Sequence, residues 1–318
     1  MKKSYKYFFY FFLIIVSLDL LWRQWFDDSQ SKLYKSSHCL KSNLDVGLCP
    51  NINMSFKRTD GEIWDIKTNH LGERITDSCV RCEKEVKRVW ILGDSMAMGY
   101  GLKSENTVAH LVHLENNVSV RTIAVDALGT LAIKRLFESS FSECKDNNKP
   151  QKIYWIWNPS DFIDDTKELN RPKFYSFIYP IHFFLAKRSY IYNLFFATKN
   201  PNQYDTNFIP IVYDTNHPTY SNVKIMIETV KKTEIPMVVL FAWGMHPTTG
   251  HPDTNDGNYE KMKSYLESLA VSQIDLRRQT EEAFFLQKKI YIPNDGHPDV
   301  DLSKLFANAI TKDLKQHE

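Results

Sequence analysis

The stretch Arg88–Gly101, with the sequence RVWILGDSMAMGYG, constrains the fold more than any other part of the chain. Val89–Leu92 is a short apolar run of the kind that forms a buried strand. It ends at Gly93-Asp94-Ser95, which suits a tight turn, and residues with helical spacing follow. The sequence therefore predicts a strand–turn–helix unit with Ser95 at the junction, where the first helical turn favours negative charge.

A serine at such a junction is suited to nucleophilic attack, because its own backbone amide can help to hold the oxyanion that forms at an acyl carbon. The same residues are also compatible with a plain turn that caps a helix. A second motif, Asp295-Gly296-His297-Pro298, supplies what a nucleophilic serine requires, namely a base and a carboxylate that orients it. Gly296 permits the tight turn that lets Asp295 pair with His297.

Alternation of strands and helices predicts the rest of the domain. Strands that are each followed by a helix indicate parallel βαβ units and an open α/β sheet. Besides 89–92, strands are expected at 118–125, 153–157, 236–243 and 271–276, with a strand-like run at 290–292 and helices at 221–232, 259–269 and 303–314.

The Gly-Asp-Ser motif at 93–95, followed by Met-Ala-Met-Gly-Tyr-Gly, resembles the first sequence block of the SGNH (GDSL-type) hydrolases, and the Asp-Gly-His-Pro motif at 295–298 resembles their last. Residues 68–74 (TNHLGER) resemble a segment that precedes the first block in membrane-anchored or exported members, and we expect it to fix a loop against the sheet. The resemblance covers residues 61–318. It implies a flavodoxin-like three-layer α/β sandwich with a central parallel sheet.

The resemblance also implies an ester hydrolase, with Ser95 as nucleophile, His297 as general base and Asp295 orienting the imidazole. It implies no requirement for a metal or an organic cofactor. The oxyanion would be held by the backbone amides of Ser95 and Gly129, the latter lying just after the expected strand at 118–125.

The third oxyanion donor is ambiguous. Asn158-Pro159-Ser160-Asp161 stands where the family carries Gly-x-Asn-Asp. Alignment on Asp161 puts Ser160 at the family's asparagine, and a serine hydroxyl donates one hydrogen bond. Alternatively Pro159 bends the loop and Asn158 supplies the amide, which is the slightly favoured interpretation.

The N-terminus predicts a membrane segment. Lys2, Lys3 and Lys6 precede the almost wholly apolar run Tyr7–Trp22, which is shorter than the roughly 20 residues that span a bilayer. A cleaved signal peptide has the same order, but no small-residue cleavage site follows the run, so an uncleaved anchor over 1–26 is preferred. The lysines favour export of the rest of the chain to a periplasmic or extracellular location.

Residues 27–60 are then expected to be a linker and a cysteine-bearing cap, and 61–318 the hydrolase-like domain. In an oxidising compartment Cys39–Cys49 and Cys79–Cys82 are plausible disulfides, which leaves Cys144 over. A zinc site is the alternative for the four paired cysteines, although their spacing matches no common zinc finger.

Two further stretches bear on the substrate. His246 and His251 lie in a loop expected at the carboxyl edge of the sheet, near the substrate or, with Asp253, as metal ligands, although a solvated loop is favoured. The aromatic stretch Phe174–Phe196 predicts a buried or lid-like helical pair, or alternatively a surface that rests on lipid or an acyl chain.

The net charge of +2 does not indicate a nucleic-acid-binding protein. The expected partners are a small-molecule, glycan or lipid ester as substrate and the membrane through the N-terminal segment. Two other functions use the same features. One is an O-acyltransferase that hands the acyl group to a cell-envelope glycan. The other is a catalytically idle, membrane-tethered binding module, which the altered block at 158–161 encourages.

Overall fold

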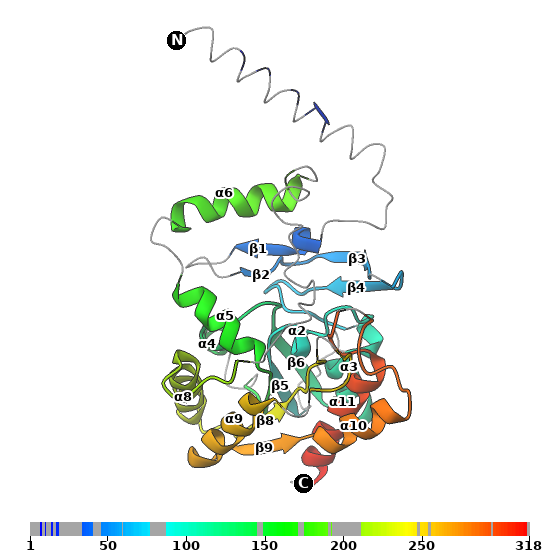
Figure 1. Cartoon of the computed structure of the whole chain (residues 1–318), viewed down its shortest axis with the longest axis vertical. Helices are drawn as coiled ribbons and strands as arrows, with labels where there is room; N and C mark the ends of the chain where they lie inside the picture. Colours follow the sequence, from blue (N-terminus) through cyan, green and yellow to red (C-terminus); the bar gives the residue numbers. More distant parts are fainter. Residues whose placement is uncertain are drawn as a thin grey trace.

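A five-stranded parallel sheet forms the centre of the protein (Figure 1). The computed structural model describes residues 7, 10, 14, 17, 18, 34–40, 46–58, 60–76, 87–144, 149–170, 175–189, 192, 211–246, 249–253, 256–293 and 295–316. In spatial order the strands are β6 (Ser119–Ala124), β5 (Arg88–Gly93), β7 (Lys152–Trp157), β8 (Met237–Phe241) and β9 (Ser272–Asp275), and each neighbouring pair is parallel.

Numbered along the chain, this order is 2-1-3-4-5, the flavodoxin-like arrangement. The parallel sheet predicted from the sequence is therefore confirmed. In such a sheet, ligands bind beyond the carboxyl ends of the two strands where the order reverses, which here are β5 and β7.

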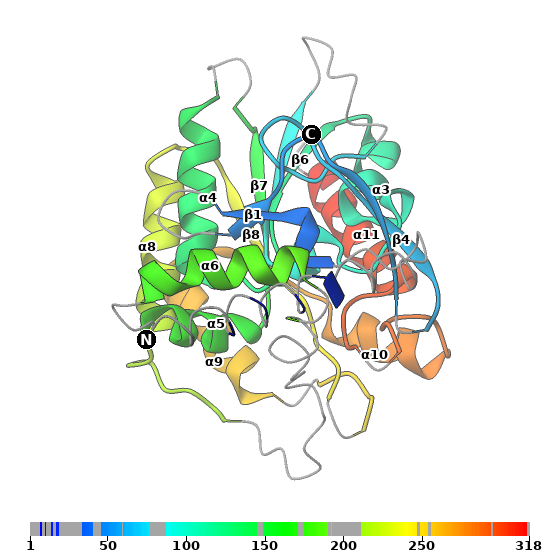
Figure 2. The same ribbon diagram turned by 90° about the horizontal axis from the view of Figure 1, so that it is seen from above.

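Helices cover both faces of the sheet, which is why its three central strands β5, β7 and β8 are almost continuously apolar. Figure 2 shows α4 and α8 on one side of the sheet and α3 and α11 on the other. Three strand tryptophans, Trp90, Trp155 and Trp157, are buried between these layers. The helices are α2 (Ser95–Met98), α3 (Val108–Asn116), α4 (Thr130–Ser142), α5 (Ser160–Leu169), α6 (Tyr175–Arg188), α8 (Pro218–Lys231), α9 (Gly257–Ser268), α10 (Arg277–Phe285) and α11 (Val300–Gln316), with 3-10 turns η1 (Tyr34–Ser37) and η4 (Ser104–Asn106).

Residues 290–292 differ from the expected strand. Tyr291 forms only an isolated antiparallel bridge with Pro298. Its buried hydroxyl donates to the backbone oxygens of Trp243 and Gly244 at 2.8 Å. This buried run therefore anchors a turn to the end of β8 through the Tyr291 hydroxyl, and it does not pair with the central sheet as a strand.

Two antiparallel hairpins and α6 lie beyond the end of the sheet that carries α2 (Figure 1). The hairpins are β1 (His38–Leu40) with β2 (Val46–Leu48), and β3 (Asn53–Lys57) with β4 (Ile63–Lys67). The second hairpin spans the domain boundary expected at residue 60. We call η1, β1, β2 and α6 together the cap.

The predicted disulfide Cys39–Cys49 is present and closes the β1–β2 hairpin. Lys187 of α6 approaches its sulfurs at 3.3 and 3.1 Å, which fastens α6 to the hairpin. Cys144 is a free thiol that accepts a contact from Arg121 at 2.9 Å. The predicted Cys79–Cys82 pair lies outside the described residues.

Most of the expected N-terminal anchor also lies outside the described residues, among which there is no helix of the length and apolar character needed to cross a bilayer. The aromatic stretch forms α6, a helix that contains Pro180. Its large side chains Phe177, Ile178, Ile181 and Phe184 are 78, 49, 54 and 53% exposed. Residues 193–196 of the expected helical pair are outside the described part.

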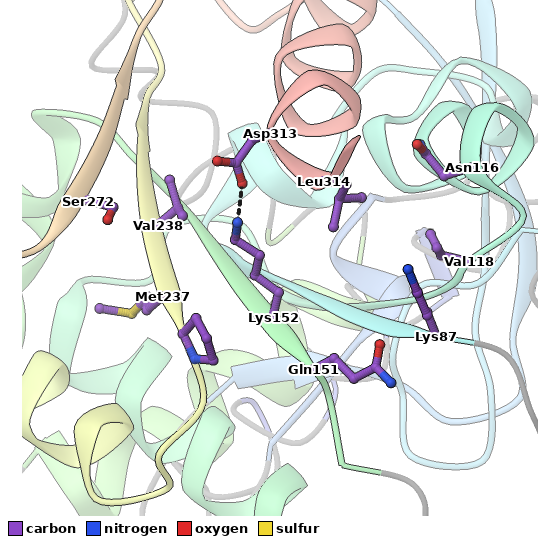
Figure 3. A pocket seen from close by; sticks show the side chains of 11 residues that line it. Lys87, Asn116, Val118, Gln151, Lys152, Met237, Val238, Ser272, Asp313 and Leu314 are labelled. Carbon is purple, nitrogen blue, oxygen red and sulfur yellow. Dashed lines mark ion pairs between the residues drawn. The ribbon is translucent and has the colours of Figure 1, made fainter. Parts of the chain in front are cut away.

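A hollow of about 500 Å³ lies at the opposite, amino-terminal edge of the sheet (Figure 3). Lys152 points into it and forms an ion pair with Asp313 at 2.5 Å. Asp313 also accepts a hydrogen bond from Tyr154. Burial and then the Asp313 contact raise the pKa of the Tyr154 hydroxyl. The Lys152 and Asp313 charges are thus paired with each other at this edge.

Candidate active site

Ser95 lies directly after β5, as predicted, and begins the short helix α2. The turn requires Gly93, because a Cβ there would lie 2.7 Å from the backbone oxygen of Ile156 on β7. Asp94 caps α2 by accepting a hydrogen bond from the amide of Met96 at 2.9 Å. Ser95 is only 7% exposed, so its hydroxyl is surrounded by protein atoms.

Arg74 holds α2 and the turn after it. Its guanidinium donates to the backbone oxygens of Met98, Gly99, Leu102 and Asp65 at 2.5–3.0 Å. Asn69 closes the loop before it by accepting from the amides of residues 71 and 73. The structural role expected for the segment 68–74 is confirmed.

The two distant motifs meet at Ser95. His297 Nε2 lies 2.9 Å from Ser95 Oγ, although 202 residues separate them in the chain. On the other side of the ring, His297 Nδ1 contacts the carboxylate of Asp295. The structure therefore brings together the three side chains predicted to act at an acyl carbon, in the order hydroxyl, imidazole, carboxylate.

The turn that carries His297 is braced by the backbone. Gly296 has φ +84°, a conformation that favours glycine. The amide of Ile292 donates to the backbone oxygen of His297 at 2.9 Å, and the amide of Asp299 donates to that of Ile290 at 2.8 Å. A histidine held by its own turn can face the serine without reorganisation.

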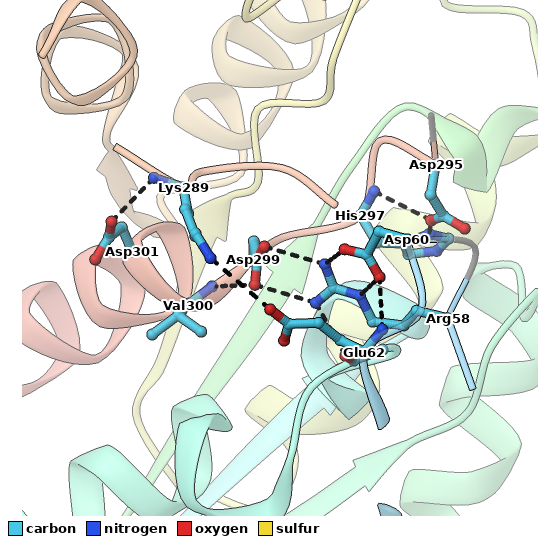
Figure 4. A network of polar contacts seen from close by, with 10 residues as sticks. Arg58, Asp60, Glu62, Lys289, Asp295, His297, Asp299, Val300 and Asp301 are labelled. Carbon is cyan, nitrogen blue, oxygen red and sulfur yellow. Dashed lines mark hydrogen bonds and ion pairs between the residues drawn. The ribbon is translucent and has the colours of Figure 1, made fainter. Parts of the chain in front are cut away.

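A salt bridge joins this turn to the β3–β4 hairpin (Figure 4). Both terminal nitrogens of Arg58 contact the carboxylate of Asp299 at 3.2 Å, and Arg58 also pairs with Asp60. The side chains of Arg58 and Asp299 are 5 and 6% exposed. Burial acts to raise the pKa of the Asp60 carboxyl, but the hydrogen bond and charge of Arg58 and the Glu62 amide together outweigh it, so the pKa is lowered.

Tyr100 covers one face of the His297 imidazole. Its ring centroid lies 4.4 Å from that of His297. Burial raises the pKa of Tyr100 to about 12, with smaller contributions from the negative charges of Asp295 and Asp126. At neutral pH the Tyr100 hydroxyl therefore stays protonated, and its ring is an uncharged neighbour of the His297 imidazole.

Asn158 and Ser160 both donate to Asp94. Asn158 Nδ2 lies 2.9 Å and Ser160 Oγ 3.1 Å from the same carboxylate oxygen. Asn158 Oδ1 accepts from the amide of Ser160, which closes the loop. Burial raises the pKa of Asp94, and the hydrogen bonds from Asn158 and Met96 oppose that shift.

Gly129 lies one strand away from Ser95, at the start of α4 after β6. A Cβ on Gly129 would lie 2.5 Å from Asp165 Oδ1 and 2.7 Å from the Asp165 amide nitrogen. Glycine is required there because the loop before α4 packs directly against α5. Its backbone therefore reaches the same carboxyl edge of the sheet as Ser95 and Asn158.

The loop with His246 and His251 borders the site. Met245 in this loop lies 3.6 Å from the position of a Cβ on Gly296. The His251 ring, however, packs against Phe284 of α10, with 4.6 Å between ring centroids. Within the described part of the chain, no cluster of three or more His, Cys, Asp or Glu side chains could hold a metal ion.

Sequence reasoning missed Tyr100 and Arg58 as neighbours of the catalytic turn. Tyr100 lies in the segment that signalled the nucleophile, yet nothing in its spacing shows that it faces a histidine 197 positions later. For Arg58, the partner Asp299 is 241 residues away. Only the folded topology brings these pairs together.

No protein-family model and no curated protein matches this sequence. Solved structures with a similar arrangement include a member of the lipolytic protein G-D-S-L family from Veillonella parvula (TM-score 0.45, 13% identity, 71% of this chain and 97% of that chain). A putative lipolytic protein of the G-D-S-L family from Desulfitobacterium hafniense has a TM-score of 0.45 and 12% identity, with 71% of this chain and 98% of that chain covered. A psychrotrophic esterase from Pseudoalteromonas has a TM-score of 0.42 and 9% identity, with 72% of this chain and 97% of that chain covered. Because these TM-scores are below 0.5, what the site does chemically is inferred from its own contacts.

Proposed function

We propose that this protein is a serine hydrolase that cleaves carboxylic esters through an acyl-serine intermediate. The observation that supports it is the continuous chain of contacts from Ser95 Oγ through His297 to Asp295. A serine hydroxyl is a weak nucleophile until a base takes its proton, and a carboxylate on Nδ1 keeps Nε2 free to act as that base.

In the proposed reaction, Ser95 Oγ attacks the acyl carbon while its proton passes to His297 Nε2. The new carbon–oxygen bond converts the carbonyl oxygen to an oxyanion. The imidazolium then gives its proton to the departing alcohol as the ester bond breaks. Water repeats the sequence on the acyl-serine, with His297 as base and then acid, and releases the carboxylic acid.

The oxyanion would be held by the backbone amides of Ser95 and Gly129 and by the Asn158 side chain. Proton counting supports Asn158 over Ser160. A serine hydroxyl has one proton, and that of Ser160 goes to Asp94. An asparagine amide has two, of which Asp94 takes one.

The experiment that tests this function is hydrolysis of p-nitrophenyl acetate by the full chain. Ser95→Ala and His297→Ala should abolish turnover, and Asp295→Asn should lower kcat by about 10³-fold or more, because the imidazole loses its fixed tautomer. Asp301→Asn is the matched control, since this carboxylate only accepts from the Lys289 amide and pairs with Lys304. An idle binding module would show no turnover that depends on Ser95.

We also propose that the protein is tethered to a membrane by residues 1–26, with the catalytic domain exported and acting on a cell-envelope glycan or lipid ester. The basic-then-apolar N-terminus, the disulfide in the cap and the exposed apolar side chains of α6 support this location. Resistance of the full chain to extraction from membranes at high pH tests the tether. Product analysis with a sugar acceptor present separates hydrolysis from acyl transfer.

A further inference from the structure

His38, at the start of β1 in the cap, contacts a carboxylate on the rim of the active site. Its Nε2 lies 2.5 Å from Oδ1 of Asp126, in the loop between β6 and α4. The imidazole is nearly buried, at 5% exposure, and the Asp126 side chain is 23% exposed. His38 Nδ1 lies 3.0 Å from the hydroxyl of Ser37. Nε2 thus faces the Asp126 carboxylate, to which it can donate a hydrogen bond, while Nδ1 faces the Ser37 hydroxyl.

The cap fixes His38 from several sides. Its backbone oxygen accepts from Lys187 Nζ of α6 at 2.7 Å. The next residue, Cys39, is tied to Cys49 by the disulfide, and the Cys49 amide donates to the backbone oxygen of Ser37 at 2.7 Å. A side chain held this firmly can position the group that it contacts.

Asp126 belongs to the short loop that ends at Gly129. Ala127, the next residue, has φ +55°, an uncommon conformation for a residue with a side chain. Gly129 itself is pressed against Asp165 of α5, so the loop is constrained at that end by the core. Near its other end, at Asp126, the loop is held by the contact with His38 of the cap. The charge of Asp126 also reaches Tyr100, the ring that lies on His297.

We propose that His38 is a positioning residue: through Asp126 it holds the loop 125–129 so that the Gly129 amide points at the oxyanion. The inference rests on the proposed hydrolase function and deepens it. It means that the oxyanion hole is completed by the N-terminal cap and not by the α/β domain alone. A loop that relaxes by even a fraction of an ångström weakens a hydrogen bond that forms only in the transition state.

The test compares His38→Ala with His38→Gln in the full chain. Glutamine places a donor N–H where Nε2 lies and should keep the contact with Asp126. We expect His38→Ala to lower kcat by roughly 10- to 100-fold with KM within about twofold, because one oxyanion donor is worth on the order of 10²-fold or more. His38→Gln should recover most of the loss. Asp126→Ala should match His38→Ala, and the double variant should be no worse than either.

A boronic acid inhibitor gives a readout that a general loss of stability would not move. Its tetrahedral adduct with the catalytic serine carries a negative oxygen, so its Ki should rise in His38→Ala by about the same factor as kcat falls. His113→Ala is the control: His113 is a half-buried histidine whose Nδ1 is bonded to the backbone oxygen of Val118, and it lies on α3, away from the loop 125–129. That variant should keep wild-type kcat and Ki.

Unchanged kcat and Ki in His38→Ala would overturn the proposal, as would a glutamine variant no better than alanine. If His38→Ala does not fold, Asp126→Asn against Asp126→Ala decides, since asparagine keeps an acceptor for Nε2 and should be the more active of the two. Equal activity of those two would overturn it. A wild-type chain that neither hydrolyses the ester nor binds the boronic acid would instead show that the proposed function has failed, and the inference with it.

Discussion

Asn158 and Ser160 make a matched pair at the level of single residues, because each donates one hydrogen bond to the same oxygen of Asp94. If Asn158 also serves the oxyanion, Asn158→Ala should lower kcat for p-nitrophenyl acetate by about 100-fold, while Ser160→Ala should stay within about fivefold. Each variant loses one hydrogen bond to the same oxygen of Asp94, and Asn158→Ala also loses the bond from the Ser160 amide, so the difference in kcat reports the oxyanion contribution only if the two variants unfold with similar free energies. A larger loss in Ser160→Ala would assign the donor to the serine.

Gly129 tolerates no side chain. In Gly129→Ala the new Cβ would meet Asp165 at 2.5–2.7 Å, so the loop must shift. We expect the free energy of unfolding to fall by about 1–3 kcal/mol, as for other overpacked sites, and kcat to fall with it. Gly244→Ala is the control, because a Cβ there meets only the Tyr259 hydroxyl at 4.0 Å. Denaturant titration and ester turnover measure both effects; an active Gly129→Ala would argue against the amide's role.

What the sequence revealed about the site was local. Ser95 and the Asp295–His297 pair each lie in a short motif whose turn chemistry is visible in neighbouring residues. Tyr100 and His38 could not be found this way, because their importance comes from partners 197 and 88 positions away. The choice between Asn158 and Ser160 depends on which of their side-chain protons are already donated to Asp94, and only the folded structure shows that.

At the scale of elements, the first turn of α5 contains an unusual buried carboxyl group. Asp161 is 1% exposed, and within the described part of the structure its Oδ1 has no hydrogen-bond partner. Burial, and then the charges of Asp94 and Asp165, raise the pKa of this carboxyl well above its ordinary value. The folded chain therefore binds this proton more tightly than the unfolded chain does, and stability should decline as pH rises from about 4 through the raised pKa.

Asp161→Asn removes that ionisation. Relative to wild type, the variant should gain in Tm by at least about 2 °C more at pH 8 than at pH 5, since a shift of one pKa unit is worth about 1.4 kcal/mol. Asp164→Asn on the same helical turn, whose carboxylate pairs with Lys167 at 2.8 Å, should show a much weaker dependence, because the Asp164 charge is the smallest of the contributions that raise the pKa of Asp161. Thermal melts at the two pH values decide the matter. A variant that loses more stability at pH 8 would contradict the assigned direction.

The strands of the sheet were predictable as elements because parallel strands buried on both faces are nearly continuous apolar runs. The hairpin β1–β2 was not, since each strand has three residues and no clear alternation. The run at 290–292 is as apolar as a strand but is used to anchor a turn through Tyr291. Apolar character identifies burial, and only the pairing partner decides whether a buried run is a strand.

At the scale of the whole molecule, the β3–β4 hairpin is joined to the turn that carries His297 by Arg58 and Asp299, which are both nearly buried. Arg58→Ala would leave the Asp299 carboxylate buried without this partner. We expect the free energy of unfolding to fall by about 3 kcal/mol, as when a buried pair is broken by removing one member. The Arg278 side chain is 81% exposed and pairs with Glu282, so Arg278→Ala should lower the free energy of unfolding by at most about 0.5 kcal/mol. Urea titration of the two variants measures the difference, and equal losses would show that Arg58 does not fasten the hairpin.

The parallel sheet and the convergence of two motifs at its carboxyl edge followed from the sequence, because βαβ units place the carboxyl ends of all strands at one edge. The position of the cap did not follow, because it depends on contacts of single residues such as His38 with Asp126 and Lys187 with the disulfide. These contacts make the N-terminal hairpins part of the active-site rim.

The most direct test of the central claim, that Ser95 is an activated nucleophile, is covalent labelling of the intact protein with a fluorophosphonate, followed by mass mapping of the modified residue. Activation by His297 predicts a single stoichiometric adduct on Ser95, absent in Ser95→Ala and strongly slowed in His297→Ala. No adduct, or an adduct on another residue that persists in Ser95→Ala, would contradict the account.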